Sequence, residues 1–227
     1  MLDRIKHLTG RLPSWAETSI VLCICFGPSI FTSFLALSSG RAFQAITFTN
    51  ARIIQTLLAE VVLTIVCVIF LYLRGCRLWS SFPFKISLSS VGLAVGLLVL
   101  SYVGYAVAYN VAVRIFGIES LRIAKLLVTV NIALIILTSI INPLFEETFV
   151  TYYLFEKTKK YGPFLFIAAS TALRVTYHLY QGWVGVLSIL PLGILFALAY
   201  VRTRNLMPLY LAHALMDLVG MLDAPHQ

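Results

Sequence analysis

Charged residues are scarce in this sequence. They make up 11% of its 227 residues, and only nine residues are Asp or Glu. Soluble domains carry about 25% charged residues and are roughly half apolar, whereas 60% of this chain is hydrophobic. No polar stretch is long enough to fold alone. The composition excludes an ordinary soluble protein and predicts an all-α polytopic membrane protein with a single membrane domain.

Several other features are missing as well. The four cysteines form no Cys-x-x-Cys pair, and there is no His-Glu-x-x-His motif, internal repeat or low-complexity tract. The net charge of +8 comes from basic residues between apolar runs rather than from a basic patch with interleaved aromatics. This placement is typical of loops that face anionic lipid headgroups. The lipid bilayer is therefore the expected partner, and nucleic acid is not.

The apolar runs predict a helical bundle of about seven transmembrane helices, or eight if one run is divided. Residues 1–125 hold three spans, residues 126–222 hold four, and residues 223–227 form a tail. The fourth span is longer than the roughly 20 residues that one crossing needs, so we expect tilt, a kink at Pro143 or protrusion from the membrane. The predicted spans are 19–37, 53–73, 91–113, 126–155, 163–180, 184–201 and 206–222.

The basic residues also predict an orientation. With seven spans, eleven of the 17 Lys and Arg residues lie on the same side as the N-terminus and five on the other, while Arg174 lies inside a span. The positive-inside rule then places the N-terminus in the cytoplasm. We expect an integral protein of a bacterial cell membrane.

Ionisable residues inside the spans are concentrated near the C-terminus. Six of the seven follow residue 140, and such groups are expensive in a bilayer, so they usually serve a function. This clustering is the main signal. Apolar and aromatic residues continue after the pair Glu146 and Glu147, which argues against a helix end at the membrane interface. We interpret Glu60, the outlier, as either structural or supporting. The seven residues are Glu60, Glu146, Glu147, Arg174, His178, His213 and Asp217.

The spacing of these residues favours one site. Arg174 and His178 share a helix face, as do His213 and Asp217, because each pair is four residues apart. The depths along the helices, roughly 10–17 Å from the cytoplasmic edge, allow Glu146 and the two histidines to meet in one layer. A carboxylate near a histidine is what a general base for water activation requires. The structural alternatives are a packing pair formed by His213 with Asp217, and simple charge neutralisation of a glutamate by Arg174.

In this pattern the chain resembles the CPBP family of intramembrane proteases, which includes type II CAAX prenyl endopeptidases and bacteriocin-processing or immunity proteins. The family has Glu-Glu-x-x-x-Arg, then a motif ending in His, then His-x-x-x-Asn or Asp. The matching residues here are Glu146-Glu147, His178 and His213-x-x-x-Asp217. The stretch from Arg174 to Gly182 also resembles a variant found in bacterial members.

The resemblance implies a glutamate-dependent endopeptidase that acts on a hydrophobic or lipid-attached peptide or protein. Glu146 and His178 would activate a water molecule. His213, with Asp217, would stabilise the oxyanion, and Glu147 would hold the site together. The arginine of the first motif is replaced by Thr151, so we expect Arg174 to supply the missing guanidinium and to pair with Glu147.

Three alternatives remain at this stage. No cofactor is favoured, but Glu146, His178 and His213 would be a plausible catalytic zinc set. Thr151 and Asp217, which stands where many family members have Asn, fit a catalytically silent member that binds a membrane partner or confers peptide resistance. A small proton-carrying transporter is the third alternative, although no inverted repeat supports it.

Overall fold

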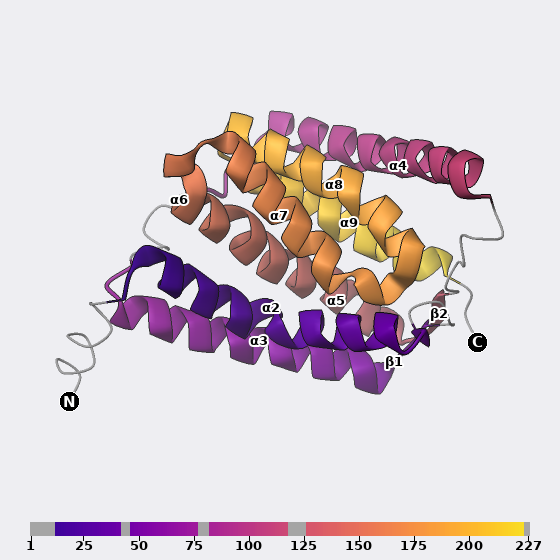
Figure 1. Cartoon of the computed structure of the whole chain (residues 1–227), viewed down its shortest axis with the longest axis horizontal. Helices are drawn as coiled ribbons and strands as arrows, with labels where there is room; N and C mark the ends of the chain where they lie inside the picture. Colours follow the sequence, from indigo (N-terminus) through magenta and orange to yellow (C-terminus); the bar gives the residue numbers. More distant parts are fainter. Residues whose placement is uncertain (1–11, 42–45, 77–81, 118–125, 225–227) are drawn as a thin grey trace.

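The structure is a computed structural model that describes residues 12–41, 46–76, 82–117 and 126–224. These residues form a bundle of long helices with a two-stranded parallel sheet at one end (Figure 1). The elements are α2 (Ser14–Ser38), β1 (Ile46–Thr49), α3 (Asn50–Leu73), α4 (Leu88–Phe116), β2 (Leu126–Thr129), α5 (Ile132–Glu146), η4 (Glu147–Tyr153), α6 (Leu154–Thr158), η5 (Lys159–Tyr161), α7 (Pro163–Tyr177), η6 (Leu179–Gln181), α8 (Gly182–Thr203) and α9 (Met207–Asp223).

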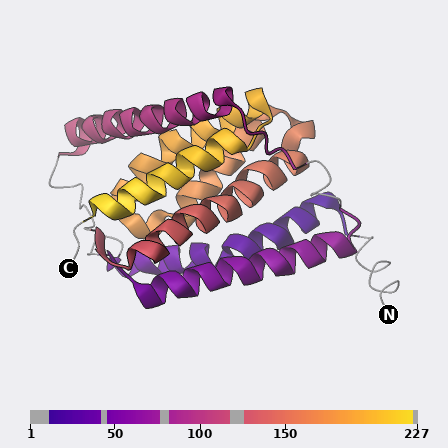
Figure 2. The same cartoon turned by 180° about the vertical axis from the view of Figure 1, so that it is seen from behind.

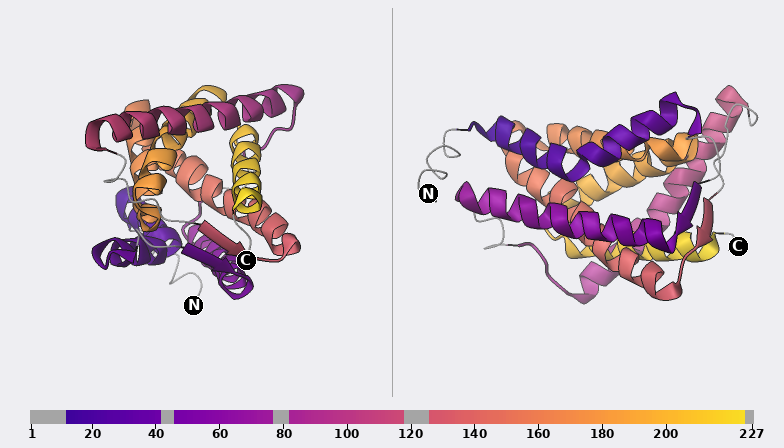
Figure 3. Two further views of the ribbon diagram at one scale, coloured as in Figure 1. Left: turned by 90° about the vertical axis from the view of Figure 1, so that its right-hand side faces the viewer. Right: turned by 90° about the horizontal axis from the view of Figure 1, so that it is seen from below.

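The bundle has a centre and two flanks. The centre consists of α5 with its continuation to η5, together with α7, α8 and α9 (Figures 1 and 2). Helices α2 and α3 pair with each other and pack against α7 and α5 on one side, whereas α4 packs against α8 and α9 on the other (Figure 3). The polar residues singled out after residue 140 therefore lie on the central helices.

The predicted class, an all-α polytopic helical bundle, is confirmed. Among the described residues, five helical segments are long and apolar enough to cross a membrane: α2, α3, α4, the segment 132–161 and α8. The most apolar windows of α2, α3 and α4 are only 17–22% buried, whereas that of the segment 132–161 is 50% buried. The flanking helices thus expose apolar side chains as lipid-facing helices do. Helices α7 and α9 are shorter and occupy the fifth and seventh predicted spans.

The start of the fourth predicted span was wrong. Residues Leu126–Thr129 form strand β2, which pairs in parallel with β1 through partners that run from Ile46 with Leu126 to Thr49 with Thr129. Both strands consist of β-branched and large apolar residues, which favour extended structure when a partner strand is available. The helix begins only at Ile132, after the Asn131 side chain accepts a hydrogen bond from the backbone N–H of Ala133.

The same end of the molecule fixes the relative height of α3 and α5. The side chain of Thr49 caps α3, and that of Asn131 caps α5. The backbone N–H of Asn131 also donates to the side-chain oxygen of Asn50, with 2.8 Å between the atoms. The two helices therefore start at nearly the same level and run in the same direction.

Candidate active site

A π-helix lies at the centre of the bundle. Helix α5 ends at Glu146, and the π-helix η4 continues it from Glu147 to Tyr153. Such wide turns are rare and frequently occur at functional sites. All seven residues of η4 are buried. The long helical segment is thus irregular directly after Glu146.

Glu147 is completely buried and its carboxylate binds three side chains. Its Oε1 lies 2.8 Å from Nδ1 of His213, and its Oε2 lies 2.6 Å from Nη2 of Arg174. Thr151, one turn further along, donates its hydroxyl proton to Oε2 over 2.7 Å. Glu147 thus joins the π-helix to α7 and α9. Charge-assisted hydrogen bonds of this length are among the strongest in proteins.

Arg174, on α7, brings the only guanidinium that the described residues place in the site. Its side chain is 1% exposed, and Nη2 also donates to the Thr151 hydroxyl over 2.9 Å. Its Nη1 lies 3.6 Å from Oε2 of Glu146, and the guanidinium lies over the ring of Phe196. The ion pair with Glu147 that the sequence led us to expect is therefore present. Thr151 takes the place of the motif's arginine in the sequence, and its hydroxyl contacts the guanidinium of Arg174.

Glu146 is held through one of its two carboxylate oxygens. Oε2 accepts a hydrogen bond from the hydroxyl of Tyr177 and faces Nη1 of Arg174. Tyr177 is itself fixed, because its ring stacks on Phe26 and its carbonyl accepts a hydrogen bond from Ser33. Within the described residues both contacts involve Oε2, so Oε1 remains available to another molecule.

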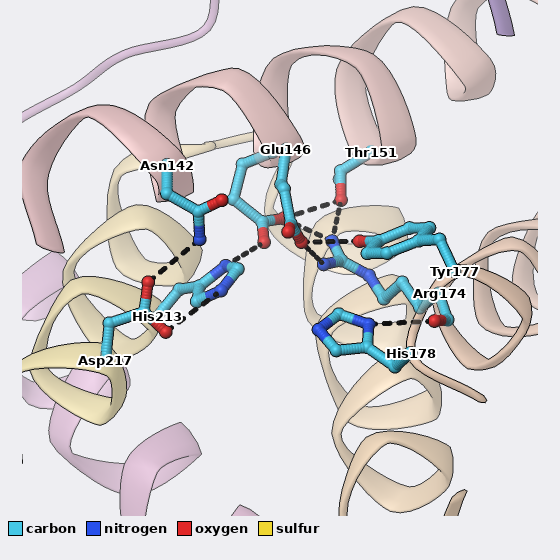
Figure 4. A network of polar contacts seen from close by, with 9 residues as sticks. Asn142, Glu146, Thr151, Arg174, Tyr177, His178, His213 and Asp217 are labelled. Carbon is cyan, nitrogen blue, oxygen red and sulfur yellow. Dashed lines mark hydrogen bonds and ion pairs between the residues drawn. The ribbon is translucent and has the colours of Figure 1, made fainter. Parts of the chain in front are cut away.

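His178 lies where α7 ends, with its ring directed into the site. Nδ1 is 2.9 Å from the backbone carbonyl of Arg174. A carbonyl only accepts, so Nδ1 carries the proton of this bond and Nε2 of the neutral ring presents a lone pair. Figure 4 shows the rings of His178 and His213 on the same side of the glutamate-bearing helix, pointing towards each other.

His213 stands between two carboxylates. Its Nδ1 contacts Glu147, and its Nε2 lies 3.6 Å from Oδ1 of Asp217, one turn along α9. Asn142 on α5 donates to Oδ2 of Asp217 over 2.9 Å (Figure 4). Both nitrogens of an imidazole can donate only when the ring is positively charged. The arrangement therefore suits a cationic His213 whose Nε2–H points away from Glu147.

The six residues predicted to form the site after residue 140 lie together, and we refer to them as the central cluster: Glu146, Glu147, Arg174, His178, His213 and Asp217. Sequence reasoning missed Tyr177 and Asn142 as members of this network. Both carried a weak signal, because Tyr177 precedes His178 directly and Asn142 is one turn before Glu146 on the same helix. Glu60 on α3 is 7% exposed and interacts electrostatically with the cluster.

The sequence left zinc at Glu146, His178 and His213 open as an alternative. Among the described residues, no group of three or more His, Cys, Asp and Glu side chains is arranged to hold a metal ion. The Arg174 guanidinium lies beside Glu146, with 3.6 Å between Nη1 and Oε2. A fixed cation at this position repels a second one. The donor set therefore fits a metal ion poorly as it stands.

The comparison with protein families agrees with the resemblance seen in the sequence. A family model described as type II CAAX prenyl endopeptidase Rce1-like matches residues 128–219. The matched segment contains the whole central cluster, from α5 to α9. Residues 128–219 are thus similar to the Rce1-like domain. No curated protein and no solved structure matches the chain.

Proposed function

We propose that this protein is an intramembrane endopeptidase that hydrolyses a peptide bond of a membrane-associated peptide or protein. The observation that carries this proposal is the one-sided anchoring of Glu146. Tyr177 and Arg174 hold Oε2, while Oε1 and Nε2 of His178 are left to bind a water molecule. A fixed carboxylate beside a neutral imidazole is suited to remove a proton from water.

In the proposed reaction, water is held between Oε1 of Glu146 and Nε2 of His178. Glu146 takes one proton as the water oxygen bonds to the carbonyl carbon. The carbonyl oxygen becomes an oxyanion and accepts a hydrogen bond from Nε2–H of His213. The C–N bond then breaks, and Glu146 returns its proton to the leaving amine. The products are a carboxylate and an amine, and Glu146 is regenerated.

The remaining residues of the cluster act as positioning groups. Glu147 orients His213 through Nδ1 and stabilises its positive charge, as carboxylates do for catalytic imidazoles. Arg174 compensates the charge of Glu147 and fixes Oε2 of Glu146. Asp217, held by Asn142, limits the rotation of the His213 ring. We place the reaction without a metal because Arg174 already supplies a cation beside Glu146.

The substrate reaches this site from the bilayer or its surface. The cluster lies in the middle of segment 132–161, about 20 Å from either end at 1.5 Å per residue. Hydrophobic or lipid-attached chains partition to such depths. With the N-terminus in the cytoplasm, as the basic residues indicate, Lys157 and Lys159 lie at the cytoplasmic end of this segment. Their positive charges face the anionic leaflet.

The test is a comparison of protein termini in membranes from cells that carry either wild type or Glu146→Gln at matched expression. Mass spectrometry identifies the N- and C-terminal ends in each sample. We expect ends that occur only with the wild type, and these name the substrate and its cleaved bond. Identical sets of ends, with the variant still able to complement a deletion, would overturn the proposal.

One observation favours a second candidate, a catalytically silent member that binds a membrane partner. Both nitrogens of His213 face carboxylates, and Asp217 lies 3.6 Å from the nitrogen that would serve the oxyanion. Asp217→Asn distinguishes the two. An endopeptidase keeps or gains activity, since an amide can donate to the oxyanion, whereas a binding protein shows no cleavage with either residue.

A further inference from the structure

A cleft that the proposed reaction does not use lies at the end of the bundle that carries α6 (Figure 1). It has a volume of about 720 Å³, lies between the end of segment 132–161 and the end of α8, and is lined by no residue of the central cluster. Its acid, Glu156, already pairs with Lys159 over 2.7 Å. Lys160 and Arg204 also line the cleft, and neither has a carboxylate partner among the described residues. The cleft therefore carries two positive charges that no acid compensates.

The guanidinium of Arg204 is held against one wall of the cleft. Its Cζ lies 3.7 Å from the centre of the Phe155 ring. A guanidinium in contact with an aromatic ring keeps the N–H groups at its edge available, and these can bind two oxygens of a phosphate at once. Lys160 supplies a more flexible ammonium, whose Nζ lies 4.8 Å from the centre of the Tyr161 ring. The cleft thus combines one fixed fork of donors with one flexible charge.

The backbone around Arg204 is fixed as well. Its φ of 51° is the only positive value at a non-glycine residue in the described part of the chain, and glycine is the usual residue where a helix ends in this way. The N–H of Arg204 donates to the carbonyl of Tyr200 over 2.9 Å. The next side chain, Asn205, accepts from the backbone N–H of Lys85 over 3.0 Å and donates to its carbonyl over 2.9 Å. The turn after α8 therefore holds Arg204 in place before any ligand arrives.

Tyr200 contributes a neutral donor to the same cleft. Its side chain lines the cleft and is only 2% exposed, and its hydroxyl has no hydrogen-bond partner among the described residues. It interacts electrostatically with Glu156 and Arg204, which puts the hydroxyl among the charged groups. Buried hydroxyl groups normally have a partner. An anion would accept from Tyr200 and compensate Lys160 and Arg204 as well, whereas water would satisfy the hydroxyl and leave both charges.

The surroundings of the cleft place it at the level of the lipid headgroups. Tyr161 and Phe164 follow the lining residues along the chain, and both are exposed. Aromatic residues are enriched at the boundary between membrane and water. The cleft lies at the end of segment 132–161, which is long and apolar enough to cross the membrane. This end is the predicted cytoplasmic one, where the leaflet surface is negatively charged. The anion available at this level is the phosphate of a phospholipid.

We propose that this cleft binds the phosphate of an anionic phospholipid. Arg204 binds two of its oxygens, Lys160 approaches a third, and Tyr200 donates its hydroxyl proton. The acyl chains of the lipid remain in the bilayer. Because Tyr152 and Phe155 also line the cleft, the lipid fastens the helical segment that carries Glu146 to the end of α8 at the membrane surface. The proposal does not depend on the peptidase reaction.

The first experiment adds phosphatidylglycerol or phosphatidylcholine to the purified full-length protein in detergent and counts bound lipids by native mass spectrometry. We expect the wild type to retain phosphatidylglycerol, and Arg204→Gln to bind it at least about fivefold more weakly, since each basic residue near an anionic lipid contributes roughly this factor. Phosphatidylcholine, whose choline group cancels the phosphate charge, should bind both proteins equally weakly. Equal binding of phosphatidylglycerol to wild type and Arg204→Gln would overturn the proposal.

The matched control is Arg202→Gln, which removes the same charge from an exposed arginine of α8 that does not line the cleft. This variant should bind phosphatidylglycerol like the wild type. An equal loss in Arg202→Gln and Arg204→Gln would mean that surface charge in general attracts the lipid, which contradicts a site. Tyr200→Phe should weaken binding by a smaller factor than Arg204→Gln, because it removes one neutral hydrogen bond.

The variant Arg204→Gly separates lipid binding from folding. Glycine suits the positive φ at this position, which offsets the lost contact with Phe155, so the thermal unfolding midpoint without lipid should stay close to that of the wild type. Added phosphatidylglycerol should raise the midpoint of the wild type but not that of the variant. An equal rise in both would contradict the site. If inorganic phosphate at the same concentration stabilises the wild type as much as phosphatidylglycerol does, the assignment to a lipid is overturned.

Discussion

Glu17 and Glu147 are both buried glutamates that bind an arginine, but their surroundings differ. Glu17, near the start of α2, contacts Nε of Arg74 at 2.8 Å and Nζ of Lys157 at 2.6 Å. We call these three residues the terminal cluster. It has one acid and two bases and joins α2, α3 and α6 near one end of the bundle. In the central cluster, by contrast, acids outnumber the permanent cations.

The difference separates two uses of buried charge. In the terminal cluster every charged group has an opposite partner, as in an ion pair that fastens helices together. In the central cluster, Oε1 of Glu146 and Nε2 of His178 have no hydrogen-bond or ion-pair partner among the described residues, and the cluster lies beside an unusual π-helix. A reaction site needs charged groups that are held in place but keep one atom free to bind water or substrate. The predictions below test this contrast, beginning with the largest expected effect.

Glu146→Gln should lower kcat by about 10²–10⁴-fold, the range for loss of a general base. The amide keeps the shape of the side chain, and its oxygen still accepts from Tyr177, so the thermal unfolding midpoint should change little. Purified variant and wild type are compared on a peptide identified by the termini experiment. A variant with wild-type turnover would contradict the role of Glu146.

Arg174→Met should reduce the free energy of unfolding by about 3–5 kcal/mol, because it leaves Glu147 buried without its main counter-charge. Adding Glu147→Gln removes the stranded charge and should recover most of this loss, although not activity. Thermal midpoints are followed by size-exclusion chromatography in one detergent. The same midpoint for the single and double variants would mean that Arg174 does not act through Glu147.

His213→Gln should lower kcat by about 10²–10³-fold with a small change in KM, as expected when one oxyanion donor is lost. The amide can still donate to Glu147, so folding should be preserved. The measurement is the split between kcat and KM on the same peptide. A change confined to KM would assign His213 to substrate binding.

Glu17→Gln, the counterpart in the terminal cluster, should reduce stability by about 1–3 kcal/mol and leave kcat at low temperature unchanged. Its two cations lie close to the membrane edge, where water and headgroups can solvate them. Both quantities come from the assays above. A large loss of kcat with an unchanged unfolding midpoint would remove the distinction between the clusters.

Strong chelators should have the smallest effect, which is none on the rate of hydrolysis by the purified enzyme. Arg174 occupies the surroundings of Glu146 that a metal would need. The rate is measured before and after treatment with phenanthroline and again after adding zinc. Activity that disappears with the chelator and returns with zinc would favour a metal site at Glu146, His178 and His213.

Much of the architecture could be predicted because it depends on local patterns. Apolar runs located the helices, and the scarcity of charge made each intramembrane acid or base conspicuous. The clustering of Glu146, His178 and His213 followed from their depths. The start of the fourth span could not be found in this way. Leu126–Thr129 is as apolar as a helix end, and only pairing with Ile46–Thr49, far away in sequence, makes it a strand.

The hydrogen-bond network of the site was harder to predict from the sequence. A period of 3.6 residues gives no hint of the π-turn after Glu146, which changes the direction of every side chain that follows. Tyr177 looked like one more aromatic residue of an apolar helix, and its bond to Glu146 depends on how α7 packs. The direct contact of Glu147 with His213 likewise joins helices whose relative rotation the sequence does not specify.

The most direct measurement of the central claim is a parallel assay of Glu146→Gln and Glu17→Gln for peptide hydrolysis and thermal unfolding. The account predicts that Glu146→Gln unfolds like wild type but has lost about 10²-fold or more of its turnover. Glu17→Gln should unfold earlier and, below its midpoint, hydrolyse peptide at the wild-type rate. Equal turnover in Glu146→Gln and wild type, with both folded, would contradict the account.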